Sequence, residues 1–371
     1  MNLSFWENRY INNADISIIG AGLVGLISAL ELRQKYPKDK IVVFERAFLG
    51  MGASTKNAGF ACFGSVGEIS DDLRNREETE CVELIRNRWE GLQRLRRLFA
   101  SDVQIGLEFN GSYEVFTNDE ETKAKRLTGK LDYYNGLVEE AIGEERVFEI
   151  RKNSFGFNIT DSTIFNKLEG QLDSGKLMHS LHKLCAQKDI KVIHGFELKH
   201  FAEKDGIQME FKNGIQLQTD KLVFATNAFT KEFFPDLDVV PYRNQLIITE
   251  EIPDLNWNTT FHFKGGLGYF RNVGNRILLG GRRDVDLENE NTKELGLTDV
   301  IQNHLIAFLH EQLHVHPDTK IEHRWSGILA HGNTKAPIIR SISENVHCAV
   351  RLGGMGIAIA SNTAKDLAYI V

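Results

Sequence analysis

The sequence predicts an α/β fold in which a doubly wound parallel sheet is combined with a second, α+β region that carries a mixed or antiparallel sheet. A strand–turn–helix–strand unit rich in glycine occupies residues 15–46. Alternating segments between residues 198 and 219 are separated by Lys-Asp-Gly and Lys-Asn-Gly turns, which are strong hairpin signals. A second glycine-rich turn precedes a predicted helix at residues 353–356.

The first unit has the parts of a Rossmann-like dinucleotide-binding motif in the expected order. We predict an apolar strand over residues 16–19, a helix over 23–35 and a second strand over 41–45. A Gly-x-Gly-x-x-Gly turn joins the first strand to the helix, and the second strand ends on Glu45. The alternative, a glycine-rich turn of an unrelated α/β protein, does not require this agreement of strand, turn, helix and acid.

Each of these residues has a physical role in such a unit. Gly20 permits the tight turn, Gly22 lets the backbone approach a pyrophosphate, and Gly25 allows close packing of helix and strand. The free N–H groups and partial positive charge of the helix N-terminus favour phosphate. The Glu45 carboxylate can accept hydrogen bonds from both ribose hydroxyls and would repel a 2′-phosphate, so NADP is the least expected dinucleotide.

The remaining elements follow from periodicity and turn signals. The apolar run at residues 221–225 is typical of a strand inside a parallel sheet. Helices are predicted over residues 71–100, 119–137, 172–187 and 298–314, and a loop over 50–67. Further strands are predicted over residues 111–117, 191–194, 198–202, 207–211, 215–219, 245–249, 268–271, 276–279 and 346–351.

Composition limits the classes of partner. A chain of 371 residues suggests two or three domains, and its net charge of −7 makes a nucleic-acid partner unexpected. No secretory signal or membrane-spanning run is visible, so we expect a cytoplasmic protein without a membrane partner. The cysteines show no disulfide or zinc spacing and are interpreted as free thiols: Cys62, Cys81, Cys185 and Cys348.

Seven motifs, taken in order, resemble the D-amino-acid-oxidase superfamily of FAD-dependent oxidoreductases, which includes glycine, sarcosine and γ-glutamylputrescine oxidases. The resemblance covers nearly the whole chain. The motifs are Gly20–Gly25 with Glu45, Gly52–Gly59, Val223–Ala228, Pro241–Gln245, Tyr269–Arg271 followed by Arg276–Gly281, Trp325–Gly327 and Leu352–Ile357.

The resemblance implies an FAD-binding domain from residues 1–95, 169–238 and 321–371, and a substrate domain from 96–168 and 239–320. It implies non-covalent FAD, because Ala330 stands near the position where sarcosine oxidases attach flavin to a cysteine, and we do not expect His331 to form the link. The cofactor contacts expected from the βαβ motif and the resemblance together are Gly20, Gly22, Leu23, Val24, Gly25, Glu45, Arg46, Ser54, Thr55, Asn57, Ala58, Val192, Ala225, Thr226, Gly327, Gly353, Gly354, Met355, Gly356 and Ile357.

Two departures from the family pattern bear on the substrate and the electron acceptor. Leu329 occupies the place of the arginine that holds a substrate carboxylate in related amino-acid oxidases, which favours an amine or N-substituted substrate. Leu278 stands where those oxidases carry a lysine that assists O₂, which weakens the case for an oxidase and leaves open a dehydrogenase that passes electrons to an acceptor other than O₂. Arg243 or Arg271 could still bind a carboxylate, with a structural ion pair as the alternative for each.

The predicted reaction is oxidation of a C–N bond in a small amine or amino acid, by hydride transfer to flavin N5 and hydrolysis of the imine. The candidate catalytic residues are Tyr269, Arg271, His262, Arg243 and His331. Tyr269 could hydrogen-bond the substrate head group, and His262 could take up a proton. Oxidation of a non-amine such as a hydroxy acid is the alternative, and a flavin-binding regulatory subunit without turnover is another. Oligomeric state is not predicted.

A protein of another class is suggested by His310-Glu-Gln-Leu-His314, which matches the His-Glu-x-x-His motif of zinc metallopeptidases. The string lies in a charged, predicted helix, and Pro317 follows before any extended zincin pattern. We therefore interpret it as a solvated surface helix and expect no metal site.

Overall fold

The computed structural model describes residues 3–371. The α-helices are α1 Phe5–Ile11, α2 Leu23–Lys35, α3 Ala53–Lys56, α4 Val66–Asp72, α5 Glu78–Arg97, α6 Glu121–Thr128, α7 Leu131–Ile142, α8 Ser174–Gln187, α9 Leu287–Glu290, α10 Asp299–Glu311 and α11 Gly356–Ile370. The 3-10 helices are η1 Asp102–Ile105, η2 Asn118–Glu120, η3 Asn227–Glu232 and η4 Arg283–Val285. The strands are β1 Ala14–Ile19, β2 Ile41–Glu45, β3 Phe60–Ala61, β4 Ser112–Glu114, β5 Phe148–Lys152, β6 Ser162–Asn166, β7 Gly170–Gln171, β8 Lys191–His194, β9 Leu198–Lys204, β10 Gly206–Phe211, β11 Gln216–Phe224, β12 Val240–Thr249, β13 Thr260–Phe263, β14 Gly268–Val273, β15 Arg276–Gly281, β16 Ile321–His331, β17 Ile338–Ser341 and β18 Val346–Val350.

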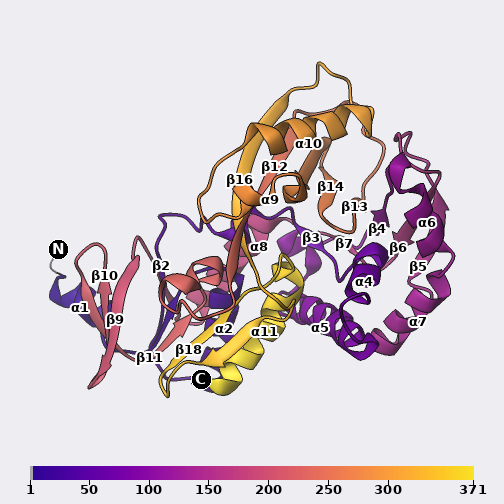
Figure 1. Ribbon diagram of the computed structural model, residues 1–371. Coiled ribbons are helices and arrows are strands. Elements are labelled where there is room, and N and C mark those ends of the chain that lie inside the picture. The colour runs from indigo at the N-terminus through magenta and orange to yellow at the C-terminus, as the bar shows by residue number, and fades with distance from the viewer. Residues whose placement is uncertain (1–2) are drawn as a thin grey trace.

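The first sheet has the order β17-β18-β11-β1-β2-β8, with the β9–β10 hairpin attached to β11. Its central pairs are parallel, so their carboxyl ends meet at one edge. Helices α2, α8 and α11 cover one face, whereas the β9–β10 hairpin and η3 pack on the other (Figure 1). This arrangement confirms the predicted doubly wound, Rossmann-like sheet.

The second sheet has the order β16-β12-β15-β14-β13-β4-β6-β5 and is mostly antiparallel, with β4 and β13 parallel. Helix α10 covers one face, and aromatic residues from β13 and β14 fill the space beneath it. Helices α5 to α7 form a second apolar cluster near the β4–β6 end of the sheet (Figure 1). The mixed sheet that the sequence predicted is therefore present.

Several predicted boundaries agree with the structure, and others change for local reasons. Helix α2 and strands β2 and β8 have the predicted ends. The helix expected over residues 119–137 is divided at Gly129, and the two strands expected between 215 and 225 form the single strand β11. The expected loop 50–67 contains α3 and β3. Strands β5, β6, β7, β13, β16 and β17 were not predicted.

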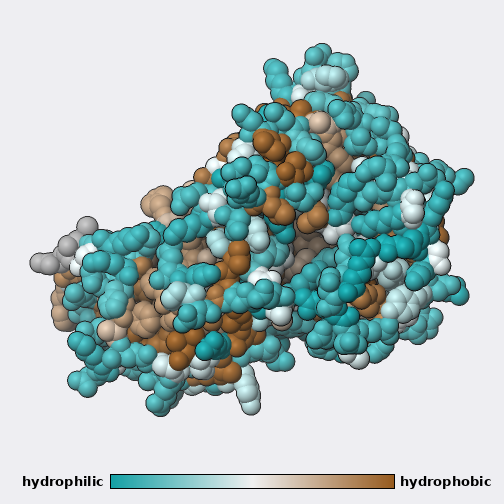
Figure 2. Space-filling view, in the orientation of Figure 1, coloured by the Kyte–Doolittle hydropathy of each residue, from teal (hydrophilic) through white to brown (hydrophobic). Residues whose placement is uncertain are grey.

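Polar residues cover most of the face shown in Figure 2. Within the described part of the chain, no helix is long and apolar enough to cross a membrane. Each of the four cysteines is buried, and none is paired in a disulfide with another described residue.

Candidate active site

The two sheets enclose a cavity of about 680 Å³. Its floor comes from the carboxyl edge of the first sheet, where β1 leads into α2 and β2 ends at Glu45. Its roof comes from β12, β13, β14 and β16 of the second sheet and from Arg283 just after β15, and the turn before α11 closes one side. Segments that are distant in sequence therefore meet around one space.

The glycines of the first motif are required by close backbone approach. Gly20 has φ +105°, and a Cβ there would lie 2.7 Å from the Ala225 carbonyl oxygen. A Cβ on Gly25 would lie 1.8 Å from the Gly20 carbonyl oxygen. A Cβ on Gly22 would lie 2.9 Å from Ser54 Oγ, so a side chain there would intrude at the cavity wall. The structure therefore supports the packing reasons inferred from sequence.

Two helix N-termini contribute to the cavity wall. Helix α2 starts after Gly22, and the 15-residue helix α11 starts after Met355; neither N-cap residue caps its helix with a side chain, although Leu23 N of α2 donates to Ser54 Oγ. The turn before α11 contains Gly353 and Gly354 at φ +57° and +84°, a conformation that favours glycine. Uncapped N-termini carry free N–H groups and partial positive charge, so both suit an anionic ligand.

Ser54 and Asn57 organise the loop that follows β2. Ser54 Oγ accepts a hydrogen bond from Leu23 N at 2.9 Å, which ties the loop to the start of α2. Asn57 Nδ2 donates to the Ser54 carbonyl oxygen at 2.7 Å, and Asn57 Oδ1 accepts from Gly59 N and the Ser174 hydroxyl. The loop is therefore held by its own polar side chains beside the cavity.

Every predicted cofactor contact lines the cavity except Gly25, Thr55 and Val192. Gly25 lies within α2 and packs against the turn, and the Thr55 hydroxyl donates to backbone carbonyls of its own loop. Val192 lies inside β8, and the chain reaches the cavity later, at Phe196 and Leu198. These three positions support the site without facing it.

One row of residues that are register partners on neighbouring strands crosses the roof. Reading across β4, β13, β14, β15 and β12, the row contains Glu114, His262, Tyr269, Gly280 and Leu246. His262, Tyr269 and Leu246 line the cavity. A Cβ on Gly280 would lie 2.8 Å from both Leu246 and the Tyr269 ring, so this glycine leaves room for the tyrosine.

Tyr269 is one of the predicted catalytic residues that the structure places at the cavity. Its hydroxyl accepts a 3.4 Å hydrogen bond from Asn244 Nδ2. Burial raises the pKa of Tyr269 to about 12, so the hydroxyl remains protonated at neutral pH. A neutral phenol in this position can donate to an anionic or carbonyl oxygen.

Arg243 does not line the cavity, which corrects its predicted role. Side chains alternate along a strand, so Asn244 and Leu246 face the cavity whereas Arg243 points to the opposite side of β12. There its guanidinium holds the fully buried Glu290 through Nε and Nη2 at 3.0 and 2.8 Å. It is a structural ion pair.

Arg271 is also occupied elsewhere, and its predicted role is corrected as well. It lies two residues beyond Tyr269 but donates to the carbonyl oxygens of Ala58, Leu172 and its neighbour Asn272 and to the side chain of Gln171. It is buried and lies outside the cavity lining. Arg271 therefore fastens the loop after α3 to the second sheet.

Arg283, which sequence reasoning missed, is the arginine that lines the cavity near Tyr269. The Arg283 guanidinium makes no hydrogen bond or ion pair with residues 3–371, and it lies 5.5 Å from the Tyr242 ring centroid. Burial lowers the pKa of Arg283 from its ordinary value. It follows the quoted Gly280-Gly281 motif by two residues, but nothing in the linear pattern indicates that η4 turns it inward.

Two histidines line the cavity in different electrostatic settings. Burial, with the charges of Arg283 and Lys335, lowers the pKa of His331 to about 3, so this ring is neutral at physiological pH. Burial alone would lower the pKa of His262 as well, but the contact with Glu169 and nearby carboxylates raise it overall. The first ring is therefore a neutral polar group, whereas the second is poised to hold a proton.

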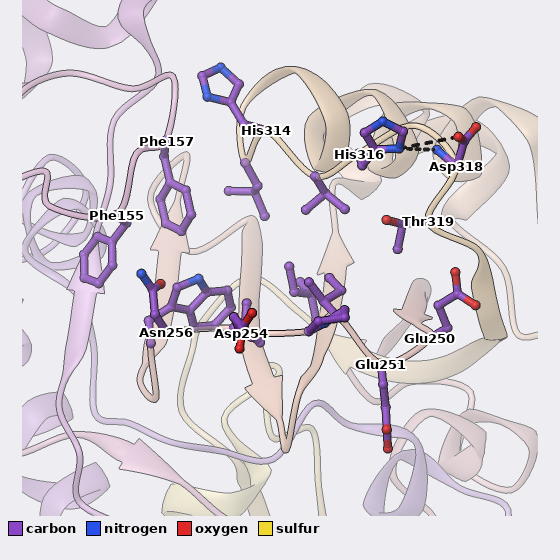
Figure 3. A pocket seen from close by; sticks show the side chains of 17 residues that line it. Phe155, Phe157, Glu250, Glu251, Asp254, Asn256, His314, His316, Asp318 and Thr319 are labelled. Atoms are coloured by element: carbon purple, nitrogen blue, oxygen red, sulfur yellow. Dashed lines mark hydrogen bonds and ion pairs between the residues drawn. The ribbon is translucent and has the colours of Figure 1, made fainter.

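A second hollow, of about 480 Å³, lies beside the C-terminal end of α10 and shares no lining residue with the first cavity (Figure 3). It includes the end of the His-Glu-x-x-His string, but α10 ends at Glu311, so His314 is not on the same helical face as His310. His314 Nδ1 contacts the Gly156 carbonyl oxygen, and His314 points away from the hollow in Figure 3. The part of the chain that the structure describes contains no group of three or more His, Cys, Asp or Glu side chains placed to hold a metal ion.

Comparison with known proteins identifies the class. Residues 15–370 match the model of the DAO family, described as FAD dependent oxidoreductase, and the chain belongs to this family. It is 21% identical to the Probable oxidoreductase OrdL of Haemophilus influenzae over 97% of this chain and 83% of the relative.

Solved structures show the same fold. Glycine oxidase from Geobacillus kaustophilus has a TM-score of 0.73 at 18% identity, covering 96% of this chain and 95% of the other. L-proline dehydrogenase from P. horikoshii has a TM-score of 0.74 at 18% identity, covering 96% and 92%.

The cavity fits the dinucleotide that the family description implies. Gly20 and Gly22 leave backbone accessible beside the N-terminus of α2, where a pyrophosphate can be bound. Glu45 lies at the end of β2 and lines the same wall, although its two oxygens also accept from Ala21 N and Ala47 N. The turn before α11 offers a second uncapped N-terminus. FAD is therefore compatible with the residues present.

Proposed function

We propose that this protein uses non-covalent FAD to oxidise the C–N bond of a small amine that carries a carboxylate, that is, an amino acid or an N-substituted amino acid. Bound flavin would accept the hydride from the carbon next to nitrogen. Support comes from the unpaired guanidinium of Arg283 in a cavity that fits the cofactor. The names of the structural relatives, which include glycine oxidase and L-proline dehydrogenase, agree with this substrate class.

Arg283 supports a carboxylate in place of the arginine that the resemblance expected at Leu329. Tyr242, over which Arg283 lies, is the register partner of Leu329 on the neighbouring strand. The segment after β15 thus brings the Arg283 guanidinium to the region of β16 where Leu329 supplies no charge. An unpaired, half-buried guanidinium is stabilised by a carboxylate, which it can bind in two-point geometry.

Other cavity residues would orient and desolvate the substrate. The Tyr269 hydroxyl can donate to the second carboxylate oxygen, and Asn244 fixes the position of that hydroxyl. Leu246, Leu329 and Ile328 supply an apolar wall that excludes water around the reacting carbon. The neutral His331 can donate or accept one hydrogen bond without adding a competing charge.

The proposal is tested by mixing purified flavoprotein anaerobically with matched pairs of compounds. Glycine, sarcosine and proline would be compared with methylamine, dimethylamine and pyrrolidine, which lack the carboxylate. We expect bleaching of the flavin by at least one carboxylated amine and at least about 10²-fold slower reduction by its partner, as expected for loss of a charged hydrogen bond of 2–3 kcal/mol. Bleaching by hydroxy acids alone would establish the alternative.

The matched variants are Arg283→Leu and Arg283→Lys, with Arg276→Leu as the surface control. Arg283→Leu should raise the substrate concentration needed for half-maximal reduction about 10²-fold, whereas Arg283→Lys should retain part of the binding. Arg276 forms exposed pairs with Glu251 and Glu322, so its variant should behave as the parent. Unchanged discrimination in Arg283→Leu would refute the carboxylate assignment. Release of the flavin by acid precipitation would support non-covalent binding.

A further inference from the structure

A buried group of one imidazole and two carboxylates lies directly behind the cavity wall. His262 on β13 and Glu114 on β4 are register partners in a parallel pair, so their side chains lie side by side on one face. Glu169, between β6 and β7, places Oε2 3.6 Å from His262 Nε2. All three residues are less than 9% exposed. The group connects the cavity to the interior of the second sheet.

The backbone holds each carboxylate through one oxygen, and the second oxygen of Glu169 faces His262. Glu169 Oε1 accepts from Phe63 N and Gly64 N at 2.8 and 3.0 Å, and Glu114 Oε2 accepts from Gly67 N at 2.7 Å. The remaining oxygens, with His262 Nε2, are buried and have no hydrogen-bond partner among residues 3–371. Buried polar atoms without a partner are costly, so His262 Nε2 and Glu169 Oε2, which lie 3.6 Å apart, are stabilised when a proton lies between them.

The charges around His262 come from several elements. Glu169, Glu114 and Glu68 raise its pKa against the opposing effect of burial. Burial raises the pKa of Glu68, but the charges of Arg88 and Lys335 lower it further, to about 2. Glu68 therefore stays ionised, and its charge is balanced by these two cations. Burial raises the pKa of Glu114 to about 7. The groups that face the cluster are Glu68 of α4, Arg88 of α5, Lys123 of α6, Lys335 of the β16–β17 segment, Cys62, and Tyr269 of β14.

We propose that His262 accepts the proton that the substrate ammonium must lose before oxidation, that Glu169 holds the imidazole in position, and that the charges of Glu169 and Glu114 raise the affinity of the ring for that proton. The inference rests on the proposed function. The N–H bond of the ammonium breaks, its electron pair stays on nitrogen, and the proton bonds to His262 Nδ1. The Nε2–H remains directed at Glu169, whose carboxylate stabilises the imidazolium.

The ring has two nitrogens, and the geometry divides their roles. Nε2 faces Glu169 inside the sheet, so Nδ1 is the nitrogen left for the cavity that His262 lines. Glu169 and Glu114 act through His262 and are positioning residues. Glu68 lines the cavity as well, but its two cationic partners leave it a poor proton acceptor.

Anaerobic stopped-flow reduction over a range of pH tests the role of the ring. In the parent protein the reduction rate should fall as pH drops below the His262 pKa, because a protonated imidazole cannot accept. His262→Asn should lower the rate at neutral pH about 10²-fold and remove this acid limb, a typical effect of losing a general base. Glu169→Gln and Glu114→Gln should lower the imidazole pKa and move the limb to lower pH.

The second readout does not depend on turnover. In protein labelled with ¹³C and ¹⁵N in histidine, the His262 signal, assigned by its loss in His262→Asn, should titrate above the ordinary histidine value. It should titrate lower in Glu169→Gln and in Glu114→Gln, which both retain an acceptor for the backbone N–H groups. Glu149→Gln, an exposed residue of β5 paired with Arg151, is the control and should change neither measurement.

The outcomes separate this inference from the proposed function. If a carboxylated amine bleaches the parent flavin but the pH profile is the same in His262→Asn, the proton-acceptor role is wrong and the proposed function stands. If no amine bleaches the parent, the proposed function fails first, and the proton-acceptor role fails with it. A His262 pKa at or below the ordinary value, or one unchanged in both glutamate variants, would overturn the roles of Glu169 and Glu114.

Discussion

The floor and the roof of the cavity are built from different parts of the polypeptide. The floor is made mainly of backbone: glycines, helix N-termini and the carboxyl ends of parallel strands around Gly20 and Gly353. The roof is made of side chains, one from each of several strands, such as His262, Tyr269 and Leu246. At Gly20 and Gly25 the backbone leaves no room for an added atom, whereas a site made of side chains can exchange residues and change substrate. The comparison leads to three tests.

The largest effect is expected on the floor, at Gly25. A Cβ in Gly25→Val would lie 1.8 Å from the Gly20 carbonyl oxygen, and backbone there cannot move without opening the β1–α2 turn. We expect loss of bound flavin and of a cooperative thermal transition, measured by absorbance and calorimetry. Gly136→Ala in α7, where a Cβ meets nothing within 4 Å, is the control and should raise stability slightly. Normal flavin content in Gly25→Val would refute the close-packing argument.

A smaller effect is expected behind the roof, at Arg243. Arg243→Met leaves the fully buried Glu290 without its cationic partner, so the free energy of unfolding should fall by about 3–5 kcal/mol. Urea denaturation measures this loss in the free energy of unfolding. Arg276→Met, which removes a cation from exposed pairs, should change the free energy of unfolding far less. Equal costs for the two variants would contradict the assignment of Arg243 to a buried structural pair.

The smallest effect is expected on the cavity side of the roof, at Gly280. The Cβ of Gly280→Ala would press on the Leu246 and Tyr269 side chains at 2.8 Å, and side chains can yield. Stability should fall by only about 1–2 kcal/mol, the usual cost of mild overpacking. Substrate affinity should fall more clearly, because the Tyr269 hydroxyl moves. An unchanged affinity for carboxylated amines would show that Tyr269 is not a substrate contact.

The arginines show where sequence reasoning reached its limit. Arg243 and Arg271 belong to recognisable motifs, yet strand alternation sends the first to Glu290 and a loop crossing ties the second to Ala58 and Leu172. Arg283 lies just past a motif and faces the cavity. Whether an arginine is free depends on which acidic groups and carbonyls surround it, and those come from distant parts of the chain.

The floor was predictable because its determinants are local. Gly20, Gly22 and Glu45 lie within one continuous unit, and the periods of strand and helix place them without knowledge of any other segment. The end at Glu311 that separates His310 from His314 was not predicted, since the helix was expected to continue to residue 314. Strands β5, β6, β7, β13, β16 and β17 were also missed, because pairing with neighbours decides whether such segments extend.

The amino-acid sequence alone determined the family, the parallel sheet and the glycine-lined backbone cradle, since these depend on residue types at fixed short spacings. The tertiary structure decided that Arg283 is unpaired, and that His262 lies beside Glu114 and near Glu169. The physical reason is that charge pairing and burial are properties of neighbours in space. Strand register and loop crossings set those neighbours, and neither is written in the spacing of a single segment.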